Sequence, residues 1–277
     1  MNNEELRRRF NPEGSLLRRQ QLRMVEIVQV VDGICRKHGI RYWLSSGTLI
    51  GAMRHNGFIP WDDDLDIEMM RTDYLRLMAV LPSELPPHLA LQNDETDANY
   101  FYFYAKVRDR RSKMLEQNGY DRMWKEQGIY IDIFPMEHHP VWLHKLTEMA
   151  VGHMYRIWRK STDDERSIRK VRRIFDFNKR YVFPALRAVL SLFTSDSTVI
   201  TSGMGIPFHN PRYASEIFPL ATHDFEGIEL PVPGNADAHL RHIYGDYLQT
   251  PDLEKLSPHV GRLEFYEDAE GGRPVTV

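Results

Sequence analysis

Apolar residues in the first forty positions recur every three or four residues, which is the spacing of one face of a helix. The run 15–38 carries this pattern, and Gly39 follows it as a residue suited to end a helix. The periodic positions are Leu17, Met24, Val28, Val31 and Cys35. We therefore predict a long helix with one face in the core.

Alternation of apolar and polar residues, typical of strands with one buried face, follows in several short segments. The predicted strands are 40–44, 64–69, 100–108 and 128–135, the last ending at a proline. Between them the spacing predicts helices over 48–55 and 72–81, with Thr72 as N-cap of the second, and a loop over 82–88. The first half of the chain is thus predicted to be α/β or α+β.

The second half has a different pattern. Residues 141–187 read as helical and contain 12 Lys and Arg against 5 Asp and Glu. A loop is predicted over 202–211, a hairpin over 223–235 and a last helix over 236–248 that stops at Gly245. We therefore divide the chain into a core with the N-terminal helix (1–140), a basic helical region (141–202) and a C-terminal segment that packs on the core (203–277).

Composition narrows the class of protein. The chain has 277 residues, 42% of them hydrophobic, and a formal net charge of −3, which argues against general nucleic-acid binding. Its single cysteine, Cys35, excludes an internal disulfide, and its apolar helical context favours a small buried hydrophobe over a reactive thiol. The first ten residues are charged, and no apolar run approaches the roughly 18 residues of a membrane span. We expect a soluble cytoplasmic protein.

The predicted strand 64–69 places carboxylates on one side. Asp64, Asp66 and Glu68 share a face, because side chains alternate along a strand. Residues two apart on that face lie about 7 Å from each other, so two carboxylates can converge on one cation. Oxygen ligands of this kind suit Mg²⁺ or Mn²⁺. The alternative is a solvated edge strand whose charges discourage aggregation.

Two other features favour the metal site. In "SSGT", Ser46, Gly47 and Thr48 precede a predicted helix, where backbone N–H groups can bind a phosphate, although a plain turn would look the same. Asp132 lies in "YIDIF" with isoleucines on the opposite face, which makes it a candidate third carboxylate.

Lys106 and Arg108 share a face of the strand 100–108, an arrangement that suits contacts to a polyphosphate or a solvated strand edge. A Ser-Gly turn before a helix, a strand with D-x-D and a later strand with one aspartate together form the signature of the nucleotidyltransferase (polymerase-β-like) fold. The predicted fold is therefore α+β, with a short mixed sheet, flanking helices and an additional helical region.

The segment "YWLSSGTLIGAMRHNGFIPWDDDLDIEM" closely resembles the core motif of the LicD family of phosphocholine transferases, a motif shared with fukutin-related proteins that transfer ribitol phosphate. "YFYAKVRDRRS", "GIYIDIFPME", "FPLATHDFEGIELPVPGNADAHL" and "IYGDYLQTP…SPH" follow in the family's order. The resemblance extends over 40–259, although 141–202 matches only as a basic helical region. Glu137 stands where the family more commonly has aspartate.

The resemblance implies a CDP-activated donor, with CDP-choline favoured, and a hydroxyl of a bacterial surface glycan or of its lipid-linked precursor as acceptor. CMP would leave, and the product would be a phosphodiester. It leaves open a ribitol-phosphate or other polyol-phosphate transferase. A nucleotidyltransferase proper that moves NMP, and a non-catalytic binding protein, are the remaining alternatives.

Within that reaction, Asp64 and Asp66 would hold Mg²⁺ or Mn²⁺ against the diphosphate. Asp132 would complete the metal shell or accept the proton of the acceptor. Asp62 and Asp63 are candidates for a supporting role around the ligands, and Asp62 could be a further ligand; a purely structural role is the alternative. The sequence leaves open whether one or two ions bind.

The remaining candidates surround the donor. Its phosphates would contact Ser46, Gly47, Thr48, Arg54, Lys106 and Arg108. Tyr100, Tyr102 and Tyr104 are candidates for an aromatic cage around a quaternary ammonium, although aromatic residues at strand spacing also build cores. His138 and His139 are adjacent and poorly placed to share a metal, so we predict no zinc site.

The basic helical region has two interpretations. In the first, Trp142, Tyr155, Ile157 and Trp158 lie among basic residues and form a face that contacts the inner surface of a membrane. In the second, the region covers the catalytic sheet and its charges are merely solvated.

Overall fold

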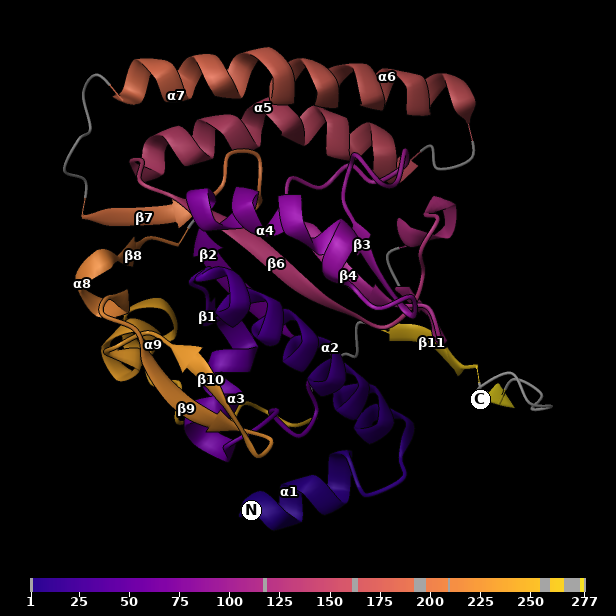
Figure 1. Cartoon of the computed structure of the whole chain (residues 1–277), viewed down its shortest axis with the longest axis vertical. Coiled ribbons are helices and arrows are strands. Elements are labelled where there is room, and N and C mark those ends of the chain that lie inside the picture. The colour runs from indigo at the N-terminus through magenta and orange to yellow at the C-terminus, as the bar shows by residue number, and fades with distance from the viewer. Residues whose placement is uncertain are drawn as a thin grey trace.

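The computed structural model describes residues 2–116, 119–160, 164–191, 198–208, 210–254, 260–266 and 275–276. A mixed sheet forms its centre, with strand order β1-β2-β6-β4-β3 and with β7 and β8 added beside the end of β6 (Figure 1). β2 and β6 are parallel, and the other neighbours are antiparallel. The strands are β1 (Trp43–Leu44), β2 (Asp66–Met70), β3 (Leu89–Gln92), β4 (Ala105–Asp109), β6 (Tyr130–Glu137), β7 (Val199–Ser202) and β8 (Arg212–Tyr213).

Helices α2 (Leu16–His38) and α4 (Arg71–Glu84) cover one face of this sheet. They bury the apolar side chains that alternate along the strands, among them Ile67, Val107 and Ile131. The long predicted helix is confirmed. Ser15 accepts a hydrogen bond from the Arg18 N–H at 3.2 Å, and Gly39 ends the helix in the left-handed conformation, which glycine adopts without steric cost.

The start of α4 differs from the prediction. Its N-cap position is Met70 and the helix begins at Arg71, so Thr72 lies inside the first turn and the prediction of Thr72 as N-cap was wrong. The helix also continues through Pro82 to Glu84, beyond its predicted end. Strand β2 leads into α4 without a loop, which leaves no room for a cap at Thr72.

The predicted strand 100–108 was also wrong in its first half, because β4 begins only at Ala105. Tyr100 and Phe101 instead pack into the apolar cluster of the helical region, outside the sheet. Conversely, β6 does not stop at Pro135 but continues to Glu137, and the Pro135 carbonyl accepts a hydrogen bond from the Gly203 N–H at 2.8 Å.

The basic region is helical, as predicted. It consists of α5 (Val141–Lys160), α6 (Glu165–Phe177), a π-helical segment (Asn178–Val182) and α7 (Phe183–Ser191). The last three form one long run beside α5 (Figure 1). The helices have an apolar cluster of their own, in which Phe101 contacts Trp158 and Phe175. β7, although it falls within 141–202, joins the central sheet; the division of the chain at 140 and 202 stays a prediction.

The C-terminal part packs on the core near α3 (Ser46–His55), as Figure 1 shows. The predicted hairpin and last helix are confirmed as β9 (Ala221–Phe225), β10 (Ile228–Val232) and α9 (Ala236–Tyr244), which ends at Gly245. The other elements are α1 (Asn3–Phe10), a 3₁₀ turn (Asp121–Met123), α8 (Ala214–Ile217) and a small sheet of β5 (Ser112–Glu116), β11 (Val260–Phe265) and β12 (Val275–Thr276). "SPH" of the quoted motifs falls at 257–259, outside the described residues.

The observed class is α+β with a mixed sheet, in agreement with the sequence pattern. Among the described residues, no helix combines the length and the apolar character needed to cross a bilayer.

Candidate active site

The candidate site lies on the sheet face opposite α2 and α4. Asp66 on β2 is the register partner of Asp132 on β6, and Asp132 is in turn the partner of Lys106 on β4. Three charged side chains from distant parts of the sequence therefore form a row across neighbouring strands. The sheet brings together Asp66 and Asp132 as the predicted pattern requires.

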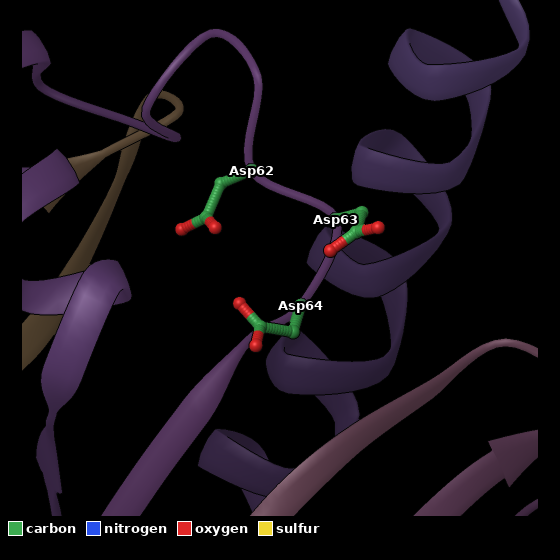
Figure 2. Close-up of side chains that lie close together, drawn as sticks. All are labelled: Asp62, Asp63 and Asp64. Carbon is green, nitrogen blue, oxygen red and sulfur yellow. The ribbon is translucent and has the colours of Figure 1, made fainter. Parts of the chain in front are cut away.

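Three consecutive aspartates lie just before β2. One carboxylate oxygen each of Asp62, Asp63 and Asp64 falls within 4.8 Å of the others, and Figure 2 shows the three side chains on the loop that leads into the strand. Two buried amides of α2 fix this loop. Gln20 donates to the Asp63 carbonyl at 2.6 Å, and Gln21 donates to the Asp62 carbonyl at 2.9 Å.

This arrangement differs from the expected one in a specific way. Asp64 precedes the strand and belongs to a compact group with Asp62 and Asp63, whereas the sequence pattern placed Asp64 on the strand and gave Asp63 only a supporting role. Asp66 and Asp132 lie next to the group and are coupled to it by charge. Burial raises the pKa of the Asp66 carboxyl well above its ordinary value, and the carboxylates of Asp64, Asp132 and Asp62 raise it further.

The N-terminus of α3 lies directly against these carboxylates. The Thr48 hydroxyl accepts a hydrogen bond from the Asp66 N–H at 2.9 Å, and the Ser45 N–H donates to the Asp66 carbonyl at 3.1 Å. A Cβ added to Gly47 would lie 2.7 Å from Oδ2 of Asp62, so a larger residue here would require the Asp62 side chain to shift. Ser46, at φ +51°, adopts the left-handed conformation that favours glycine. The positive end of the α3 dipole thus adjoins the acidic group.

Lys106 is buried and contacts Asp132. Its Nζ lies 2.7 Å from Oδ1 of Asp132, 3.8 Å from Oε1 of Glu116 and 3.3 Å from the centre of the Tyr130 ring. Burial raises the pKa of Asp132 to about 6, while the Lys106 ammonium opposes that rise. The lysine therefore positions Asp132 and is not exposed for a phosphate as the sequence suggested.

The two predicted arginines make different contacts. Arg108 is fully buried and donates to the Gln92 side chain at 2.5 Å and to the Gly128 carbonyl at 2.7 Å. Arg54 donates to the Tyr247 carbonyl at 3.0 Å and so ties the C-terminal segment to α3. These bonds give both arginines a structural role. Burial lowers the pKa of the Arg54 guanidinium and the charge of nearby Asp62 opposes that shift, so donor-phosphate binding by Arg54 stays a prediction.

The three tyrosines form part of a larger aromatic cluster. Tyr100 is buried against Trp124, while Tyr102 and Tyr104 stack on each other with ring centres 5.0 Å apart. Tyr104 leads to a row of rings that the sequence analysis did not assign. Its ring lies 4.6 Å from that of Phe134, which lies 5.7 Å from that of the half-exposed Phe208.

Phe134 could have been found from the sequence, because it follows Asp132 by two positions on one face of β6. Arg212 could not, since it lies 144 residues from its partner Glu68, which it contacts at 2.6 Å. Burial acts to raise the pKa of Glu68, but the charge of Arg212 brings it below its ordinary value. Glu68 therefore remains an ionised structural residue beside the site.

Known proteins share the sequence of this site. Residues 39–191 match a family model described as "LicD/FKTN/FKRP, nucleotidyltransferase domain". The chain is 28% identical to the lipopolysaccharide cholinephosphotransferase LicD of Haemophilus influenzae over 88% of its own length and 95% of that protein. It is 44% identical to the human ribitol 5-phosphate transferase FKRP over 17% of the chain and 10% of that protein.

Proposed function

The chain belongs to the LicD family, and on that premise we propose that it is a transferase that moves phosphocholine from a CDP-activated donor to a sugar hydroxyl. The acceptor we propose is a bacterial surface glycan or its lipid-linked precursor. One observation carries the proposal: the acidic group that adjoins the α3 N-terminus lies within a chain that matches a cholinephosphotransferase over nearly its whole length. We propose the cytoplasm as its compartment, in keeping with the single buried cysteine.

We assign the sheet and its site to the nucleotidyltransferase fold. The chain runs from β1 through the Ser-Gly start of α3 to β2, and β6 then adds Asp132 beside Asp66. This order of elements supports the assignment, as does the name of the matching family model.

The residues fit a divalent cation. All the candidate ligands are carboxylate oxygens, which suit Mg²⁺ or Mn²⁺, and three of them converge within 4.8 Å. The three that converge are Asp62, Asp63 and Asp64, and Asp64 also belongs to the predicted trio with Asp66 and Asp132. Asp64 and Asp66 would hold the ion, with Asp62 beside them, and the bound ion would neutralise charge on the donor phosphates.

The remaining groups have separate tasks. The N–H groups of Ser46 and Gly47 would bind a donor phosphate at the α3 N-terminus. Asp132, held by Lys106 and with a pKa of about 6, would accept the proton of the acceptor hydroxyl. As the new bond from the acceptor oxygen to phosphorus forms, the bond from that phosphorus to the CMP phosphate oxygen breaks.

The aromatic row favours choline over ribitol as the alcohol. Quaternary ammonium groups bind to the faces of aromatic rings, whereas a polyol needs hydrogen-bond partners. Tyr104, Phe134 and Phe208 provide such rings, and Phe134 lies two residues beyond Asp132 on the same face of β6. Ribitol phosphate is the second candidate, because the motif around the site matches the ribitol 5-phosphate transferase.

The test offers the purified protein CDP-choline or CDP-ribitol with Mg²⁺ and measures CMP release, with and without glycan acceptors. We expect release from CDP-choline that increases with acceptor. Phe208→Ala should raise the KM for CDP-choline and leave any turnover of CDP-ribitol unchanged. Release from neither donor by a correctly folded protein would refute the proposal.

The products separate transfer of the phospho-alcohol from transfer of NMP. With CDP-choline labelled in the choline, the label should appear on the glycan. If label from the cytidine appeared there instead, the protein would be a nucleotidyltransferase proper. Donor binding without turnover would identify a non-catalytic binding protein.

A further inference from the structure

Helix α5 exposes large apolar side chains on its outer face. The exposed fractions are 63% for Trp142, 51% for Leu146 and 75% for Met149. Their spacing of four and three residues places them on one face of the helix, opposite the buried Val151 and Trp158. Exposed apolar groups that cluster in this way commonly mark a contact with a membrane or a partner.

Helix α6 and the π-helical segment after it expose cations. Lys170, Arg173 and Arg180 are exposed, as is the aromatic ring of Phe177, of which 58% is accessible. Within the part of the chain that the structure describes, no carboxylate forms an ion pair with these three cations, whereas Arg169 pairs with Glu165. The outer face of α6 therefore carries positive charge that is not balanced locally.

The two helices pack side by side along one edge of the molecule, far from α1 (Figure 1). Both bury their apolar stripe in the same cluster, so their exposed residues lie on the outside of the pair. We define the basic-apolar face as Trp142, Leu146, Met149, Lys170, Arg173, Phe177 and Arg180.

The face differs from the one that the sequence predicted. Trp158 is fully buried, and Tyr155 and Ile157 pack against the same internal cluster. Three of the four expected contact residues are therefore part of the core of the helical region. Only Trp142 of that set is exposed for an outside contact.

We propose that the basic-apolar face docks this protein on an anionic lipid bilayer. Lysine and arginine are attracted to the negative headgroups, and Trp, Leu and Met side chains enter the boundary between headgroups and acyl chains. The complementary charge and the aliphatic side chains fit a lipid surface better than a nucleic acid, which lacks an apolar layer. The inference does not depend on which donor or acceptor the enzyme uses.

The first test is co-sedimentation of the whole protein with vesicles in the absence of donor and acceptor. We expect binding to vesicles of phosphatidylcholine with phosphatidylglycerol, no binding to phosphatidylcholine alone, and weaker binding as salt rises. Neutralising Lys170, Arg173 and Arg180 to glutamine should lower the partition coefficient at least tenfold.

The matched control carries the same change of charge elsewhere on the surface. Arg8→Gln, Arg9→Gln and Arg41→Gln remove three exposed cations outside the basic-apolar face and should leave vesicle binding unchanged. Equal binding of both triple variants, equal binding to both kinds of vesicle, or no binding at all would overturn the proposal.

The second test reports on the apolar residues. Because Cys35 is buried and is the only cysteine, Met149→Cys provides a single exposed site for an environment-sensitive dye. The emission of this dye should shift to the blue with anionic vesicles, while a dye at Arg8→Cys should not respond. An unchanged spectrum at position 149 would show that α5 does not enter the bilayer and would also overturn the proposal.

Discussion

Lys106 and Asp132 illustrate how one ion pair can support a reactive group. Both side chains are almost completely buried, and the 2.7 Å contact between them lies over the Tyr130 ring. A buried charge without its partner is strongly unfavourable, while removing both members of a pair is often nearly neutral. The pair can therefore be tested separately from catalysis, by its effect on stability.

Lys106→Met should lower the free energy of unfolding by about 3 kcal/mol, because it leaves Asp132 buried without its cation. Adding Asp132→Asn to that variant should recover part of the loss. Urea unfolding of both single variants and the double variant, in EDTA, measures the coupling. Strictly additive effects would show that the two side chains do not interact.

Asp64→Asn and Asp66→Asn should each reduce transfer by about 10³-fold or more while the protein stays folded, because each removes a proposed metal ligand but relieves like-charge repulsion. Activity assays and circular dichroism measure the two effects. Asp237→Asn is a matched control, since Asp237 is exposed on α9 and pairs with Arg241 outside the acidic group. Near-normal turnover with a normal metal requirement in either aspartate variant would contradict the ligand assignment.

At the scale of the elements, α3 packs on the loop that carries the aspartates through two glycines. Gly47 leaves space for the carboxylate of Asp62, and Gly51 leaves space for the loop backbone. A Cβ on Gly51 would lie 2.4 Å from the Gly57 carbonyl oxygen and 2.9 Å from the Ile59 nitrogen, so backbone would have to move.

Gly51→Ala should therefore destabilise the protein by about 1–3 kcal/mol, the usual range for overpacking. Gly33→Ala is the control, because it also lies in a helix but has no atom within 4 Å of an added Cβ. It should be neutral or stabilise by up to about 1 kcal/mol, since alanine has the higher helix propensity. Thermal unfolding of both variants checks the contrast, and equal effects would refute the close approach of α3 to the loop.

Elements whose residues follow one simple period could be predicted from the sequence. The helix α2, the acidic strand and the β9–β10 hairpin each have a clear pattern and suitable end residues. The strands β3, β7 and β8 are only two to four residues long, too short for any period to appear. The segment 100–104 alternates like a strand, but both Tyr100 and Phe101 are buried in the apolar cluster of the helical region.

For the site, the residue types and their alternation along the strands predicted which carboxylates lie there, but not which residues they contact. No local sequence pattern shows that Lys106 contacts Asp132, or that Arg108 donates its hydrogen bonds to Gln92 and Gly128. Such pairings depend on the order of strands in the sheet. The position of Asp62 against Gly47 likewise depends on how α3 folds back on the loop.

At the scale of the whole molecule, the metal requirement tests whether loop, helix and strands act as one site. EDTA should abolish transfer, and Mg²⁺ or Mn²⁺ should restore it. Zn²⁺ should restore it poorly, because the proposed ligands include no nitrogen or sulfur. Full activity after exhaustive chelation would contradict a metal-dependent reaction.

The same cation should stabilise the fold in a pH-dependent way. Burial raises the pKa of Asp66, and it raises that of Asp132 to about 6, so the folded protein holds protons on these carboxyls more tightly than the unfolded chain does. In the chelated protein, their contribution to stability is therefore present below about pH 4 and is lost as the pH rises through about 6. A bound cation offsets that loss by pairing with the ionised carboxylates, and it competes with protons for them.

The rise in Tm on adding Mn²⁺ should consequently be larger near pH 7.5 than near pH 5, where a proton on the ligand Asp66 competes with the cation. Because samples with Mn²⁺ and with EDTA are compared at the same pH, the effect on Tm of groups that do not contact the cation is the same in both and cancels in the difference. Asp64→Asn serves as the control and should show little rise at any pH. A rise at pH 5 as large as at pH 7.5, or an unchanged rise in the variant, would mean that the cation binds somewhere other than these carboxylates.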